Sequence, residues 1–126
     1  ALFSAVLDDR VRGVLADGGL LSYRALAMSD RYLHGANIFI PGVLKHFDLP
    51  RVAAAVADRN LTILDPVDAM RKPDGIAGAR RAYEWTRQAY SVLGAGERFE
   101  VMARQPGADP ADACLQFLGR WLGRSG

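Results

Sequence analysis

Apolar residues gather along this chain in three short runs of strand length, each closed by turn-forming residues. The first run covers Val11 to Ala16 and ends at Asp17-Gly18-Gly19, the second covers Leu61 to Leu64, and the third covers Phe99 to Met102. The second run is apolar throughout apart from one β-branched threonine, which is typical of a parallel strand buried on both faces. Pro66 follows it and ends the strand, because proline has no N–H to give to a β-ladder. The pattern therefore predicts three strands.

Helical segments alternate with these strands. Ala1 to Leu7 is predicted to be the end of a helix, and a small helix is predicted over Leu49 to Asp58, with Pro50 near its start. A long helix is predicted from about Gly75 to Leu93, with Asp74 as its N-cap. Each of these helices stands directly before a predicted strand.

The last predicted helix follows the third strand. It begins at Pro110, where proline is tolerated, and is capped by Asp109. Its apolar face is predicted to consist of Cys114, Phe117, Leu118, Trp121 and Leu122. We therefore expect the thiol of Cys114 to be buried and inert.

Strands that alternate with helices predict parallel pairing with right-handed crossovers. The 126 residues suit a single domain, residues 1–126, or a piece of one. The fold class that we expect is α/β, with about three parallel strands and flanking helices. A sheet of this size has at least one open edge, which further strands or a second copy of the chain could cover.

Composition and charge narrow the classes of function. The formal net charge is only +2, and the 16 Lys and Arg are scattered with two basic pairs, Arg71-Lys72 and Arg80-Arg81, so no nucleic-acid partner is expected. No apolar run approaches the ~20 residues of a membrane span, so no membrane partner is expected. One cysteine excludes an internal disulfide and a cysteine-based metal cluster. We expect no cofactor, and the lone cysteine without a signal peptide favours a cytoplasmic location.

Two carboxylates, Asp65 and Asp68, follow the second predicted strand. Positions just past the carboxyl ends of parallel strands are where open α/β sheets bind ligands. Asp65 ends the strand itself and could accept from the backbone of Val67 or Asp68 in an Asx-turn. Asp68 is either the acid of a catalytic triad or a loop carboxylate that caps a nearby turn.

Four ordered segments, which together cover nearly the whole chain, carry a resemblance to a known family. They are Ala1 to Val11, His34 to Asp48, Leu49 to Asp68 and Ala82 to Met102. In this order they resemble the C-terminal half of an α/β-hydrolase of the acetyl xylan esterase and dienelactone hydrolase-like group. The resemblance implies a partial hydrolase-type sheet, hydrolysis of a small carboxylic ester such as an acetylated carbohydrate, and the N-terminal half of the same fold as a partner. It also places Asp68 where the triad acid is expected.

Two departures from that family bear on activity. The nucleophile elbow Gly-x-Ser-x-Gly does not occur in these residues, and the family has it directly before the position of Ala1. The loop expected to hold the catalytic histidine runs from Arg104 to Asp109, with Ala108 about where the histidine would be. A serine triad needs both groups. We therefore expect this chain alone to be inactive as an esterase, and the alternative is a non-catalytic, degenerate hydrolase-like scaffold or binding domain.

The remaining candidate site residues lie between the first and second strands. The resemblance places His34 near the mouth of an active site, where it is a candidate substitute base or substrate-binding residue; a structural or surface role is the alternative. Asn37, with nearby aromatic residues, could line a pocket for an acyl or sugar group, or the segment could form local core. His46 is expected to pack or to lie on the surface, and the twelve-residue spacing of the two histidines fits no metal motif.

Overall fold

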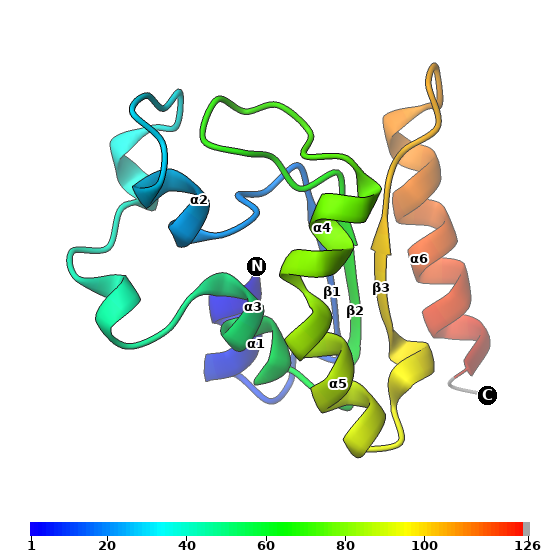
Figure 1. The fold of residues 1–126 in the computed structure, drawn as a ribbon. Coiled ribbons are helices and arrows are strands. Elements are labelled where there is room, and N and C mark those ends of the chain that lie inside the picture. The colour runs from blue at the N-terminus through cyan, green and yellow to red at the C-terminus, as the bar shows by residue number, and fades with distance from the viewer. Residues whose placement is uncertain (125–126) are drawn as a thin grey trace.

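The computed structural model describes residues 1–124 and contains a three-stranded parallel sheet flanked by helices (Figure 1). The strands are β1 (Gly13–Asp17), β2 (Asn60–Leu64) and β3 (Phe99–Met102), in the order β1-β2-β3. The α-helices are α1 (Leu2–Leu7), α2 (Tyr23–Ala27), α3 (Leu49–Ala54), α4 (Ile76–Ala82), α5 (Glu84–Val92) and α6 (Pro110–Arg124), and the 3-10 helices are η1 (Ala36–Ile38), η2 (Val43–Lys45) and η3 (Gly96–Arg98). The predicted α/β class with three parallel strands is confirmed.

The central strand β2 is enclosed on both faces, as its apolar sequence predicts. Helices α1, α3, α4 and α5 cover one face of the sheet, and α6 covers the other (Figure 1). Because side chains alternate along a strand, Leu61 and Ile63 join the main core on the first face, while Thr62 and Leu64 face α6. In this core, Tyr90 stacks on Phe99 with ring centroids 5.2 Å apart.

The predicted long helix over residues 75–93 is two helices, α4 and α5, that meet at Tyr83. Tyr83 is only 2% exposed, and its hydroxyl donates to the carbonyl oxygen of Leu21 at 3.2 Å. The backbone departs from helical geometry at Tyr83, where this long-range contact is made. The spacing of apolar residues along the sequence does not predict such a break. The predicted cap is also wrong: Gly75, with a φ of 75°, precedes α4, and no side chain caps the helix.

Helix α6 begins at Pro110 as predicted, and Oδ1 of Asp109 accepts from the N–H of Ala111 at 2.8 Å. The predicted buried face is partly wrong, because the row that meets the sheet is Ala113, Phe117 and Trp121, at four-residue spacing. The apolar residues that remain exposed on α6 are Cys114, Leu115, Leu118 and Leu122. Cys114 therefore does not have the buried position expected from the sequence, since it points about a quarter-turn away from the row that meets the sheet.

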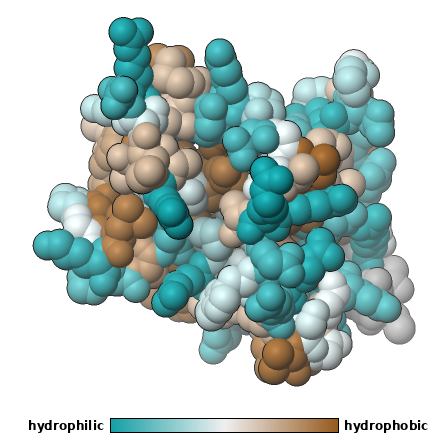
Figure 2. Space-filling view, viewed as in Figure 1, coloured by the Kyte–Doolittle hydropathy of each residue, from teal (hydrophilic) through white to brown (hydrophobic). Residues whose placement is uncertain are grey.

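The long excursion between β1 and α3 has a small core of its own, formed by Tyr23, Leu26, Val43, Leu49 and Ala69. Asp48 organises it by accepting from three backbone N–H groups: its Oδ1 from Tyr23 at 2.6 Å and Leu49 at 2.7 Å, and its Oδ2 from Arg24 at 3.1 Å. One carboxylate thereby fixes the starts of both α2 and α3. Figure 2 shows hydrophobic surface gathered over this excursion, where Leu33, Phe39, Ile40 and Leu44 are exposed.

Candidate binding site at the carboxyl edge of the sheet

Charged side chains meet where the three strands end. Asp17 is the last residue of β1, Asp65 follows β2, and Arg104 stands two residues after β3. Nη2 of Arg104 donates to Oδ2 of Asp17 at 2.6 Å, and Nη1 lies 3.6 Å from Oδ2 of Asp65. The backbone N–H of Arg104 also donates to Oδ1 of Asp65 at 2.9 Å. This strand-end cluster joins all three strands at their carboxyl ends.

Asp65 does not form the Asx-turn that its sequence context suggested, because its carboxylate accepts from Arg104. Its φ of 44° shows that the chain turns sharply at that point. Arg104 was missed by the sequence analysis. Its position just after the third strand could have revealed it. Ligands bind past the carboxyl ends of parallel strands, and this is the same signal that pointed to the two aspartates. Its Nε is buried without a hydrogen-bond partner in the part of the chain that the structure describes.

Asp68 organises the turn that follows. Its Oδ1 accepts from the N–H groups of Met70 at 2.8 Å and Lys72 at 2.9 Å, while its own N–H donates to the carbonyl of Lys72 at 2.8 Å. This is the geometry of the turn-capping interpretation that the sequence left open. A triad acid instead directs its carboxylate at the imidazole of a histidine.

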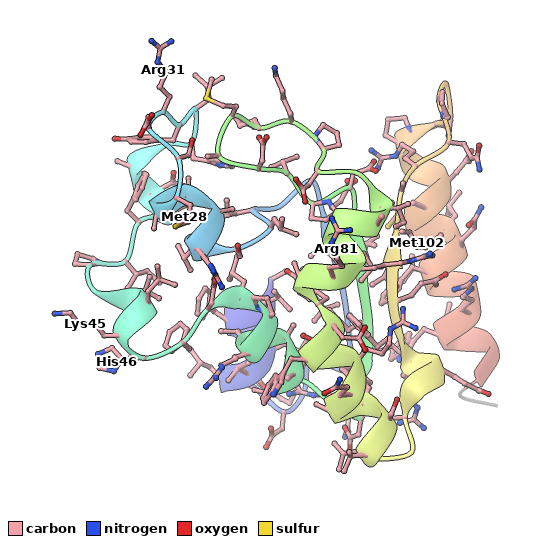
Figure 3. All side chains as sticks on the ribbon, in the orientation of Figure 1. Met28, Arg31, Lys45, His46, Arg81 and Met102 are labelled. Carbon is pink, nitrogen blue, oxygen red and sulfur yellow. The ribbon has the colours of Figure 1, made fainter. Side chains whose placement is uncertain are left out.

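His34 and Asp68, the two candidate catalytic residues, are brought together by the fold. Nε2 of His34 lies 2.8 Å from the backbone carbonyl oxygen of Asp68, so Nε2 carries the proton and donates. A neighbouring contact, from the N–H of Leu33 to the carbonyl of Ala69 at 2.8 Å, holds the two loops side by side. The histidine therefore contacts the backbone of the acidic loop and not its carboxylate. His46, the residue after η2, is exposed and points away from the body of the molecule (Figure 3).

A pocket of about 630 Å³ opens beside the strand-end cluster, between the first turn of α1, the end of β1 and the excursion around η1. Most of its lining is apolar, including Leu2, Phe3, Leu20, Ile38, Ile40, Leu49 and Ile63. Of the two candidate substrate-binding residues, Asn37 lines this pocket and His34 does not. Its volume falls within the range of roughly 300–1,000 Å³ typical of small-molecule sites.

Two tyrosines give the pocket fixed polar groups. The hydroxyl of Tyr23 donates to the carbonyl of Ile38 at 2.9 Å, and Tyr83 donates to Leu21. Burial, with a smaller contribution from the carboxylate of Asp48, raises the pKa of both phenols. Both side chains therefore stay protonated and act as structural donors.

Residues 1–124 contain no group of three His, Cys, Asp or Glu side chains arranged to hold a metal ion. Within the same residues, no helix is both long and apolar enough to cross a bilayer. Comparisons of this chain with protein-family models, with curated proteins and with solved structures found no match.

Proposed function

We propose that this chain is a non-catalytic, hydrolase-like binding domain that holds a small, largely apolar ligand in the pocket at the carboxyl edge of its sheet. The observation that carries the proposal is the position of that pocket: it lies at the carboxyl end of β1, where open α/β sheets bind ligands. Its apolar lining favours a ligand with a short hydrocarbon or acyl part.

The contacts of the candidate catalytic residues support binding over catalysis. The carboxylate of Asp68 is occupied by two backbone N–H groups, and the Nε2 proton of His34 is donated to a carbonyl. Nδ1 is then the only nitrogen of His34 able to accept a proton, and among the described residues no carboxylate orients it. Such a histidine is oriented by a neutral carbonyl and lacks the carboxylate that stabilises the protonated imidazole in a triad.

The pocket can be tested with two matched variants on the same excursion. Ile40 lines the pocket and is 43% exposed, whereas Leu44 is 46% exposed and lies outside its lining. Calorimetric titration with ethyl butyrate should give saturable binding to the wild-type chain and to Leu44→Asp. Ile40→Asp should bind at least about fivefold more weakly, because it places a charge beside an apolar ligand. An equal loss in both variants, or no binding to the wild type, would rule the pocket out.

A second candidate function is hydrolysis of a small carboxylic ester, such as an acetylated carbohydrate. One observation favours it: Ala1 and Leu2, at the start of α1, line the pocket. In the resembled family, the nucleophile stands directly before this helix. Turnover of p-nitrophenyl acetate distinguishes the two functions. Hydrolysis above background that disappears in Asp68→Asn would favour the esterase, because asparagine can still accept from the turn N–H groups but carries no charge.

A further inference from the structure

A second cavity, of about 460 Å³, lies on the other face of the sheet, between α6 and the amino-terminal halves of β2 and β3. Figure 1 shows α6 running alongside β3, with η3 leading into the amino end of that strand. The strands contribute Asn60, Thr62 and Glu100 to the cavity, and the helix contributes Phe117, Arg120 and Trp121. The cavity is therefore separate from the pocket at the carboxyl edge.

Two polar side chains of β2 reach this cavity with their hydrogen-bonding groups unused. Thr62 lines the cavity, and its hydroxyl has no hydrogen-bond partner among the side chains and backbone that the structure describes. The side-chain amide of Asn60 has none within the same residues. The two residues are two positions apart on one strand, so their side chains stand on the same face. Because these groups are accessible from the cavity and unpaired among the described side chains, they are available to hydrogen-bond a molecule that enters it.

The charges that the described residues place in the lining of the cavity cancel. The carboxylates of Glu97 and Glu100 are matched by the guanidinium groups of Arg98 and Arg120, which also line it. Arg120 donates directly to Oε2 of Glu100. A charged ligand would have to disturb this balance in a partly enclosed space, whereas a neutral one would not.

We propose that this cavity binds a neutral, polyhydroxylated ligand of monosaccharide size. A hydroxyl group both donates and accepts, as do the free groups of Asn60 and Thr62, and it can also donate to Glu100 or accept from Arg120. The half-buried rings of Phe117 and Trp121 offer an apolar surface for the carbon skeleton of such a ligand. This inference is independent of the function proposed for the carboxyl-edge pocket.

The two tryptophans of the chain allow a direct test. Trp85 lies on α5, on the opposite face of the sheet, and is 53% exposed. In a Trp85→Phe background, fluorescence reports on Trp121 alone. Titration with methyl α-D-glucopyranoside should change this emission saturably. Thr62→Val and Asn60→Ala should each weaken binding about three- to tenfold, the loss expected for one hydrogen bond between neutral groups. Gln88→Ala, which removes an exposed amide on α5, on the opposite face of the sheet, should leave binding unchanged.

Thr62→Val also separates a binding role from a structural one. If the hydroxyl is simply an unsatisfied group, its replacement by a methyl should raise the melting temperature and leave sugar affinity unchanged, which would overturn the proposal. The proposal would equally be overturned by an absence of saturable binding, or by glucosamine or glucuronate binding as tightly as the neutral glucoside. Should Thr62→Val fail to fold, the comparison of Asn60→Ala with Gln88→Ala decides the question.

Discussion

Replacement of Asp68 is the perturbation that most sharply separates a turn cap from a catalytic acid. In Asp68→Ala, the N–H groups of Met70 and Lys72 lose the oxygen that accepts from both, at 2.8 and 2.9 Å. In Asp68→Asn, a side-chain carbonyl oxygen can still occupy the same position. The two variants therefore differ in whether the turn is capped, while neither carries the carboxylate charge.

The structure gives the size of the expected effect. A hydrogen bond to a charged acceptor contributes roughly 1.5–3 kcal/mol, and the lower end applies because Lys72 is exposed. We expect Asp68→Ala to lower the free energy of unfolding by about 2 kcal/mol, since water partly replaces the lost acceptor, and Asp68→Asn by about 1 kcal/mol. For a domain of this size, the larger loss corresponds to a fall in melting temperature of roughly 6–10 °C.

Urea denaturation followed by circular dichroism measures both variants, with Asp30→Ala as the matched control. Asp30 is an exposed aspartate for which the described structure has no hydrogen bond or ion pair, so its loss should change stability by less than about 0.5 kcal/mol. Wild-type stability in Asp68→Ala would refute the capping argument. Equal destabilisation by alanine and asparagine would refute it too, because the charge rather than the acceptor position would then matter.

Three further predictions concern other parts of the fold. Arg104→Met should destabilise the protein by about 1 kcal/mol, because it removes the guanidinium that pairs with both carboxylates of the strand-end cluster, and urea unfolding should reveal a smaller loss at high salt. Thr86→Val should cost about 1–2 kcal/mol in thermal unfolding, because the buried hydroxyl that donates to the carbonyl of Pro50 at 2.6 Å is lost. Burial raises the pKa of Tyr83 and Tyr90 above that of an unfolded phenol, so their contribution to stability is complete below about pH 10 and is lost as the pH rises further. Absorbance at 295 nm should therefore show these two phenols ionising only together with alkaline unfolding, and normal titration in the folded protein would contradict the assignment.

The sequence predicted the elements that depend on local pattern. All three strands were found because each is a short apolar run closed by turn residues, and α6 was found because Asp109 and Pro110 mark its start. The break at Tyr83 was missed, because it coincides with a hydrogen bond to Leu21, 62 residues away in the chain. The exposure of Cys114 was missed for a related reason: α6 carries apolar residues around more than half of its circumference, and only packing against the sheet decides which row is buried.

The candidate site was only partly predictable. Their positions past the carboxyl end of a predicted parallel strand pointed to Asp65 and Asp68. Position alone could not tell which backbone or side-chain groups their carboxylates contact. Arg104 carries no motif, and its role depends on three strand ends meeting in space. The contact between His34 and the carbonyl of Asp68 spans 34 residues, and no spacing rule in the sequence describes it.

The central proposal is that the carboxyl-edge pocket binds a small, largely apolar ligand without transforming it. Two-dimensional ¹H–¹⁵N spectra recorded during titration with ethyl butyrate test the location of binding, and one-dimensional ¹H spectra of the same sample follow the fate of the ester. The account predicts saturable shifts at Leu20, Ile38 and Ile40, which line the pocket, while the signals of the intact ester persist. Shifts confined to residues outside the pocket, or conversion of the ester to butyrate in proportion to protein concentration, would contradict it.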